Sequence, residues 1–431
     1  MSRRLSTQDA DFDIRFAELL GAKREVSEDV DQVVREILDN VRIHGDGALV
    51  EYTKKFDRLE ASSVDDLVVT DREMDAALEK VPLDTLNALK LAADRIRAHH
   101  QKQLPKNDRY KDHLGVELGS RWTAIEAAGL YVPGGLASYP SSVLMNAIPA
   151  VVAGVERIAM VVPSPGGILN PQVLAAAHIA GVSEIYRIGG AQAVAALAYG
   201  TQSIEPVSKI VGPGNAYVAA AKRRVFGTVG IDMIAGPSEV LIIADGHSNP
   251  DWVAADLLAQ AEHDPSAQSI LITNDEPLAD AVAQAVERQL TTLPRQDVAR
   301  ASWQDFGAII CVKTLEEAMP LANRIAAEHL ELAVADPEKL LEKVRNAGAV
   351  FLGHHTPEAI GDYVGGSNHV LPTARSAKFS SGLSVLDFIK RTSILKCTPD
   401  SLRALGPAAI TLGEAEGLTA HARSVAIRLN L

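Results

Sequence analysis

Cysteine is nearly absent from this chain, since Cys311 and Cys397 are the only two among 431 residues. Two thiols cannot build a disulfide framework, and sulfur therefore cannot supply a zinc cluster. Cys311 stands in the apolar run AIICV, where an inert buried thiol is more common than a nucleophile. An excess of basic charge is also missing, because 42 Lys and Arg face 55 Asp and Glu, giving a net charge of −13. This balance disfavours nucleic acid or an anionic membrane as the main partner and favours a small molecule.

Long hydrophobic runs are lacking as well. The first residues, MSRRLSTQDADFDIRF, contain no apolar core of a signal peptide, and the most apolar stretch, residues 143–155, is too short to span a bilayer. We therefore expect a soluble, cytoplasmic protein. With 47% apolar residues among 431, the chain can build sizeable cores and is long enough for two or more domains.

The sequence is rich in short β-branched runs that alternate with Ala-rich helical stretches. Residues 1–105 are predicted to be mostly helical, and residues from 386 onward to form a helical tail. Between them lie the runs RIAMVVPSP, EIYRIGG, SKIVGPGN, EVLIIADG, SILITND, GAIICV, LELAVAD and GAVFLG. Such alternation implies βαβ units with parallel sheets. Because the runs fall into two groups around residues 231–238, we predict an α/β fold with two open Rossmann-like parallel-sheet domains facing each other.

Three glycine loops follow predicted strands: YVPGG (131–135), IGGAQA (188–193) and GPGNAY (212–217). None completes GxGxxG, since Tyr217 replaces the third glycine of the last loop. Each could still present backbone N–H groups to a phosphate at a helix N-terminus, or could be only a tight βα turn. Three in one domain favour a nucleotide site.

Several polar side chains are of the types that bind metals or move protons. Residues 250–263 read as a helix that places Gln260 and His263 one turn apart, where they could share a cation or form an ordinary polar face. Glu328 and His329 are adjacent in AAEHLEL, which suits proton abstraction and water activation but also a surface pair. This is not an HExxH motif, because no second His follows.

Two further segments carry candidate residues. Asp362 and His369 lie seven residues apart in a Gly-rich loop suited to a ligand wall, although Asp362 could equally form an Asx-turn or a helix N-cap. Glu416 and His421 lie in the C-terminal helical segment, where a solvated tail is the alternative.

The motifs together resemble the histidinol dehydrogenase family over nearly the whole chain. The resemblance is carried by KREVSEDVDQVVREI, GLYVPGG, GGAQAVAALAYGT, KIVGPGNAYV, IDMIAGPSEVLIIAD, LLAQAEHD, EHLEL, GDYVGGSNHVLPT, FSSGLSVLDFIKRTS and EGLTAHARSV. It implies one zinc ion per subunit, held by Gln260, His263, Asp362 and His421. It also implies NAD contacts at Tyr131, Gln192 and Asn215, and a catalytic pair, Glu328 and His329. The implied substrate contacts are Ser238, Gln260, His263, His329, Asp362, His369, Glu416 and His421.

The resemblance further implies a four-electron oxidation of L-histidinol to L-histidine, the last step of histidine biosynthesis, through histidinaldehyde. It implies a homodimer in which the C-terminal tail reaches the partner's active site. We accordingly expect an N-terminal dimerisation segment at 1–25, a discontinuous domain at 26–130 and 239–384 with the metal and catalytic residues, an NAD-binding domain at 131–238, and a helical dimerisation tail at 385–431.

Two alternatives remain open at this point. One is a relative of the same fold that oxidises another small polar alcohol, and the other is a nucleotide- or metal-binding module without catalysis.

Overall fold

Two parallel β-sheets form the body of the molecule in the computed structural model, which describes residues 2–21, 28–134, 139–234 and 236–431. The six-stranded sheet has the order β1 (Arg3–Ser6), β11 (Ala308–Cys311), β10 (Gln268–Thr273), β9 (Glu239–Ala244), β12 (His329–Ala333) and β13 (Ala349–Leu352). The five-stranded sheet has the order β6 (Glu184–Tyr186), β5 (Arg157–Val161), β4 (Ala127–Tyr131), β7 (Lys209–Val211) and β8 (Gly230–Ile231). Every pairing within both sheets is parallel. The predicted α/β fold with two parallel sheets is therefore confirmed.

Helices cover both faces of each sheet, which is why the central strands are apolar throughout. On the six-stranded sheet, one face packs against α1 (Phe12–Gly21), α13 (Leu315–Ile325) and α14 (Pro337–Leu341). The other face packs against α10 (Pro250–Ala261), α11 (Glu276–Leu290) and α12 (Gln296–Asp305). A strand buried on both faces needs no polar alternation, and β9 and β10 are buried at every position.

The five-stranded sheet is covered in the same way. Helices α4 (Asp71–Lys80), α5 (Leu83–Gln101), α6 (Pro140–Ala153) and α7 (Pro171–Ala180) build the core on one face. Helices α2 (Glu28–His44), α3 (Asp46–Asp57), α8 (Gly190–Tyr199) and α9 (Ala216–Val225) build the core on the other. Short helical turns occur at η1 (Asp65–Leu67), η2 (Pro165–Gly167), η3 (Ser376–Lys378), η4 (Val385–Phe388) and η5 (Ile427–Leu429).

This packing differs from the domain division expected from the sequence. Residues 28–101 share their cores mainly with the five-stranded sheet, although Val370 and Leu383 pack into the core that includes α4 and α5. Strand β1 pairs with β11, so the described part of segment 1–25 belongs to the six-stranded sheet; residues 22–25 lie outside the described residues. An amphipathic helix shows in its sequence that one face is buried, but not which sheet buries it.

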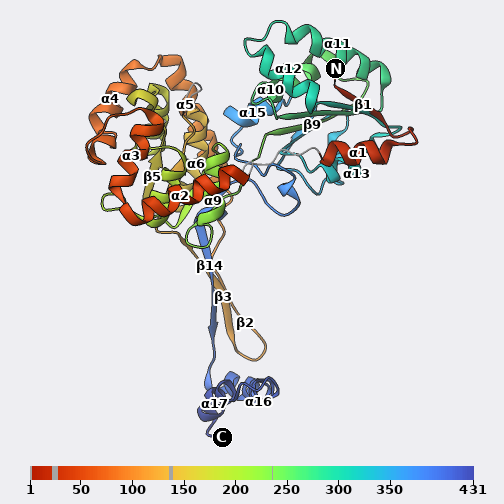
Figure 1. Cartoon of the computed structure of the whole chain (residues 1–431). Helices are drawn as coiled ribbons and strands as arrows, with labels where there is room; N and C mark the ends of the chain where they lie inside the picture. The colour runs from red at the N-terminus through yellow and green to blue at the C-terminus, as the bar shows by residue number, and fades with distance from the viewer. Residues whose placement is uncertain (1, 22–27, 135–138, 235) are drawn as a thin grey trace.

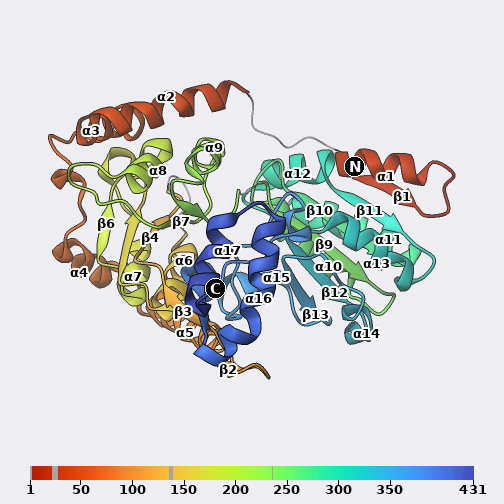
Figure 2. The same ribbon diagram turned by 90° about the horizontal axis from the view of Figure 1, so that it is seen from below.

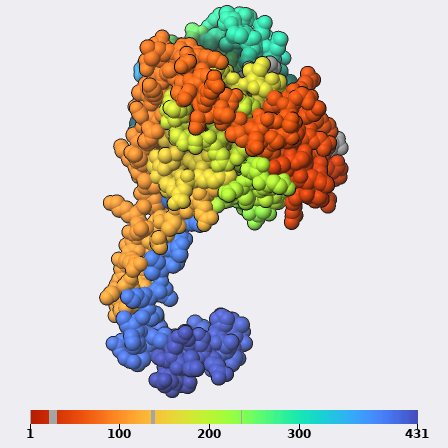
Figure 3. All heavy atoms as spheres, turned by 90° about the vertical axis from the view of Figure 1, so that its left-hand side faces the viewer, coloured from red at the N-terminus to blue at the C-terminus, as the bar shows by residue number. Residues whose placement is uncertain are grey.

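The C-terminal segment leaves the body along a β-stalk. Strand β14 (Ile389–Lys396) pairs antiparallel with β3 (Glu117–Ala124), which pairs with β2 (Asp108–Lys111). The helices α16 (Pro399–Ala415) and α17 (Thr419–Ala426) follow at the far end of this stalk (Figure 1). The space-filling view shows them as a hook held away from both sheets (Figure 3). The predicted all-helical tail is thus wrong for residues 389–396, which form a strand.

None of the helices within the described ranges is long and apolar enough to cross a membrane.

Candidate active site

The predicted catalytic pair lies at the amino-terminal edge of the six-stranded sheet. His329 is the first residue of β12, and Glu328 precedes it. Gln260 belongs to the last turn of α10, and His263 follows that helix in a turn closed by its own N–H on the Gln260 carbonyl at 3.2 Å. The apolar face of α10 packs on the sheet, which brings its polar end to the edge where β9 and β12 begin.

His329 is the centre of the contacts at this edge. Its Nδ1 lies 3.1 Å from the Gln260 Oε1 and 3.1 Å from the Glu239 carbonyl oxygen. Its Nε2 is buried 3.6 Å from Asp362 Oδ1 and makes no hydrogen bond with any of the described residues. Gln260 Nε2 is 3.4 Å from His263 Nδ1. Gln260, His263, His329 and Asp362 therefore come together in the structure, while the roles that the resemblance implies for them stay a prediction.

The loop that carries Asp362 ties this edge to the five-stranded sheet. Asp362 lies in α15 (Glu358–Tyr363), and its carbonyl oxygen is 3.0 Å from His369 Nδ1. His369 Nε2 is 3.4 Å from the hydroxyl of Ser142 on α6. Arg95 on α5 donates to the carbonyls of Val364 and Gly365. The site is thus built between the two halves of the body.

Buried carboxyl groups surround His329. Burial disfavours protonation of His329, but Glu358, Glu328 and Asp362 outweigh it and raise its pKa well above the ordinary value. Burial raises the pKa of Glu328 to about 7 and that of Glu358 to about 8. Glu328 Oε2 accepts from the Glu239 N–H at 3.0 Å, and Glu358 Oε2 lies 3.6 Å from His329 Nδ1. A carboxyl group that titrates near neutral pH suits general acid–base chemistry.

Glu239 and Glu358 were missed by sequence reasoning, as was Glu331. Glu239 and Glu331 stand inside the strands EVLIIA and HLELA, where every residue is buried. Glu331 Oε1 accepts from the Glu358 N–H at 2.7 Å. Glu239 and Glu331 could have been recognised because each is a charged residue in an otherwise apolar strand. Such a strand is buried on both faces of its sheet, and a buried carboxyl group needs a polar partner.

The predicted metal ligands are only partly assembled within one chain. In the described ranges, no group of three or more His, Cys, Asp or Glu side chains is arranged to hold a metal ion. Gln260, His263 and Asp362 nevertheless converge and offer an amide oxygen, an imidazole and a carboxylate. Desolvation lowers the pKa of His263, although its side chain keeps an exposed face. Burial alone would raise the pKa of Asp362, but the neighbouring imidazoles of His329, His369 and His263 together lower this pKa below its ordinary value. A neutral imidazole and an ionised carboxylate are the ligand forms that zinc binds, so three of four donors fit.

Glu416 and His421 are not brought to this site within one chain. Both are exposed, Glu416 after α16 and His421 within α17. In the view from below, α16 and α17 are drawn in front of the body (Figure 2), and the side view shows that the C-terminal segment is separated from it (Figure 3).

The predicted NAD contacts all lie at the carboxyl edge of the five-stranded sheet. Tyr131 ends β4, and its hydroxyl accepts from the Gly190 N–H at 3.0 Å. Gln192, in the first turn of α8, is 2% exposed, and its Oε1 has no partner. Asn215 caps α9 by accepting from the N–H groups of Tyr217 and Val218.

A buried ion pair fixes the backbone of the loop before Asn215. Lys222 pairs with Asp232, and both side chains are almost completely buried. Lys222 also donates to the Gly212 carbonyl at 2.9 Å, while Asp232 accepts from the Gly212 N–H at 2.8 Å. Gly212 has φ +109°, and a Cβ there would lie 2.1 Å from the Tyr131 carbonyl oxygen. A side chain at this position would push the GPGNAY loop off the sheet edge.

Ser238, the remaining predicted substrate contact, directly precedes β9 at the amino edge of the other sheet. Gly135 of the YVPGG loop lies outside the described residues.

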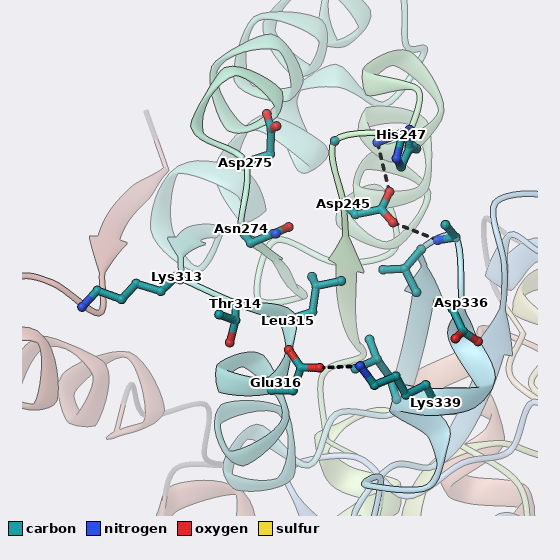
Figure 4. Close-up of a pocket in the computed structure, with 14 residues that line it drawn as sticks. Asp245, His247, Asn274, Asp275, Lys313, Thr314, Leu315, Glu316, Asp336 and Lys339 are labelled. Carbon is teal, nitrogen blue, oxygen red and sulfur yellow. Dashed lines mark hydrogen bonds and ion pairs between the residues drawn. The ribbon is translucent and has the colours of Figure 1, made fainter.

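A separate open cleft of about 680 Å³ lies at the carboxyl edge of the six-stranded sheet (Figure 4). Some of its polar groups pair with one another: Glu316 pairs with Lys339 at 2.9 Å, and Asp245 accepts from the N–H groups of His247 and Ala335. This cleft is at the opposite edge from His329 and includes none of the predicted site residues.

Comparisons with known proteins agree with the motif resemblance. A family model described as histidinol dehydrogenase matches residues 21–429. The histidinol dehydrogenase of Brucella suis biovar 1 (strain 1330) is 70% identical over 427 residues, which cover 99% of each chain. That of Mesorhizobium japonicum is 69% identical over 431 residues and 100% of both chains. The crystal structure of histidinol dehydrogenase from Elizabethkingia anophelis matches with a TM-score of 0.95 at 38% identity, covering 100% of this chain and 98% of the other.

Proposed function

Because the chain belongs to the histidinol dehydrogenase family, we propose that it oxidises L-histidinol to L-histidine with NAD, as the last step of histidine biosynthesis in the cytoplasm. The observation that carries this proposal is the buried pair Glu328 and His329, 6% and 3% exposed, beside the converging side chains of Gln260, His263 and Asp362. Groups that can transfer protons therefore lie beside groups that can bind a ligand.

The first oxidation converts the alcohol to the aldehyde. We assign His329 as the base that takes the hydroxyl proton, because its buried Nε2 has no hydrogen-bond partner in the described part of the chain. NAD, when bound, would supply the hydride acceptor for the same carbon. For this role His329 must begin neutral, and Asp362 binding a metal cation would no longer stabilise the charged imidazole. The buried setting keeps bulk water away from the proton that moves.

The second oxidation adds a water oxygen to the aldehyde and removes a second hydride. Glu328 is assigned to activate that water, because burial raises its pKa to about 7 and its carboxyl group can thus accept a proton near neutral pH. His329 returns its first proton to the oxyanion that forms as water adds to the aldehyde, and the neutral imidazole then accepts the hydroxyl proton of the hydrated aldehyde as the second hydride leaves. Each step removes two electrons as a hydride, so two NAD molecules are reduced per histidinol. A thiol route is disfavoured, because Cys311 lies at the end of β11 and Cys397 after the β-stalk.

Zinc would be held by Gln260, His263 and Asp362 from one chain and by His421 from another. When bound, it would orient the imidazole and amino nitrogens of the substrate. Ser238, His369 and Glu416 are assigned to substrate contacts, and Tyr131, Gln192 and Asn215 to NAD.

A second copy of this chain is proposed to complete the site. The tail exposes Leu405, Leu412, Leu418 and Ile427, and the C-terminal helices of this tail are held away from the body at the end of the stalk (Figure 3). Burying them against a partner would be favourable, and a symmetric dimer would bring each tail to the opposite site.

The direct test is NADH absorbance with purified protein and L-histidinol. We expect NADH to form faster with L-histidinol than with other small polar alcohols. A strong preference for another alcohol would refute the substrate assignment. Ligand binding with no NADH would favour a binding module instead.

A further inference from the structure

Three buried polar side chains around the carboxyl edge of the five-stranded sheet have an oxygen atom without a hydrogen-bond partner. They are Asp57 at the end of α3, Ser164 after β5 and Gln192 in α8, and they are 7%, 0% and 2% exposed. Burying an unsatisfied polar atom costs stability, and an unpaired carboxyl group costs most. Such costs are retained where a ligand uses the atom.

The loops that carry these three residues meet at one place. A Cβ on Gly189 would lie 2.5 Å from Pro163, so the loop before Ser164 touches the loop before Gln192. A Cβ on Gly167 would lie 3.0 Å from Leu59, which places the end of α3 against η2. The Tyr131 hydroxyl receives the Gly190 N–H, and the charge of Asp57 raises the pKa of Tyr131 after the larger effect of burial.

Asp57 is the only one of these three residues that can carry a charge, and no ion pair within the described ranges compensates it. Burial alone raises its pKa to about 6. Its Oδ2 has neither a hydrogen bond nor an ion pair in the described part of the chain. Its neighbour on the same helix, Glu51, is exposed to solvent. A carboxylate in this position repels phosphate and can only accept hydrogen bonds.

We propose that Asp57 accepts hydrogen bonds from the vicinal hydroxyls of the adenosine ribose of NAD and thereby selects NAD over NADP. This inference rests on the proposed use of NAD. A carboxylate and a diol can form two hydrogen bonds, as acidic residues do with ribose in other dinucleotide sites. A 2′-phosphate would remove one donor and bring a negative charge against the carboxylate.

The adenosine ribose is favoured over the nicotinamide ribose by the layers of the fold. Helix α6, which contacts the active-site loop through Ser142 and His369, lies in the core on one face of the five-stranded sheet. Helix α3 lies in the core on the other face. A dinucleotide with its nicotinamide near His329 would therefore extend across the sheet edge and bring its adenosine half toward Asp57.

The test compares Asp57→Asn and Asp57→Ala with Glu51→Gln as the matched control on the same helix. We expect the KM for NAD to rise about 10- to 100-fold in the Asp57 variants. The KM for histidinol at saturating NAD should stay unchanged. The thermal midpoint at pH 8 should not fall. ADP-ribose, which contains the adenosine ribose, should inhibit the variants more weakly, whereas nicotinamide mononucleotide should bind as before.

Several outcomes separate this inference from the proposed function. An unchanged KM for NAD in a folded Asp57→Asn protein would overturn the role of Asp57 while leaving the activity intact. Weakened binding of nicotinamide mononucleotide alone would overturn the choice of ribose. The unaltered protein gives a further check if both variants fail to fold: equal kcat/KM with NAD and NADP would overturn the proposal. If the unaltered protein forms no NADH from histidinol, the proposed function itself fails.

Discussion

A mixed dimer tests directly whether the C-terminal tail completes the partner's site. One chain carries His329→Asn in the body, and the other carries His421→Ala in the tail. Within one chain, His421 is exposed on α17, and this helix lies at the far end of the β-stalk, away from the body (Figure 1). If the tail acts on the partner, a mixed dimer has one site with both changes and one site with neither.

The expected recovery follows from this count. Each variant alone should be nearly inactive, and mixed dimers isolated through two different affinity tags should show about half of the wild-type rate per dimer. NADH absorbance at saturating histidinol and NAD measures the rate. As a matched control, His329→Asn combined with Asp362→Ala places both changes in bodies, so neither site of the mixed dimer is intact and no activity should return.

Absence of recovery in a verified mixed dimer would refute the shared site. Full activity of a demonstrably monomeric preparation would refute it as well, because a lone chain lacks the fourth ligand.

Three further changes probe the metal site, a glycine loop and a buried carboxyl group. Asp362→Ala should lose both bound zinc and activity, since it removes the only carboxylate donor of the set; full activity in a zinc-free Asp362→Ala protein would exclude the metal role. Lys222→Met should lower the free energy of unfolding by about 3–5 kcal/mol, because it leaves Asp232 buried and unpaired; urea unfolding measures this, and an unchanged midpoint would contradict the ion pair's importance. The folded-state pKa of Asp57 is raised from 3.8 to about 6, so the unmodified protein should lose stability as the pH rises through that window. Asp57→Asn should remove this pH-dependent loss in the free energy of unfolding. The loss is up to about 3 kcal/mol, or about half of that if water screens the carboxylate. Thermal unfolding from pH 4 to 8 measures this effect. Parallel profiles of the thermal midpoint against pH in the two proteins would contradict it.

The sequence predicted the two parallel sheets because their strands are short, apolar and closed by glycine or proline. It did not predict residues 389–396 as a strand, because that stalk strand is largely exposed and shows no apolar alternation. Its partner β3 is also distant in the chain. The sequence also could not predict which sheet packs against α2–α5, because amphipathic spacing shows that one helix face is buried but not which surface buries it.

The candidate site could be predicted in part. Helical spacing placed Gln260 beside His263, and both converge with His329 and Asp362 in the structure. Spacing could not place Glu358 beside His329, because that contact depends on how α15 packs after β13. His421 would need a second chain, which a single sequence does not describe.

The most direct test of the central claim, that one buried site carries out both oxidations through His329, is the amount of NADH formed per L-histidinol consumed. We predict two NADH and one L-histidine from the unaltered protein, with no free aldehyde. The His329→Asn protein should form almost no NADH while keeping its zinc. A ratio of one with aldehyde accumulating, or a substantial rate in the His329→Asn protein, would contradict the account.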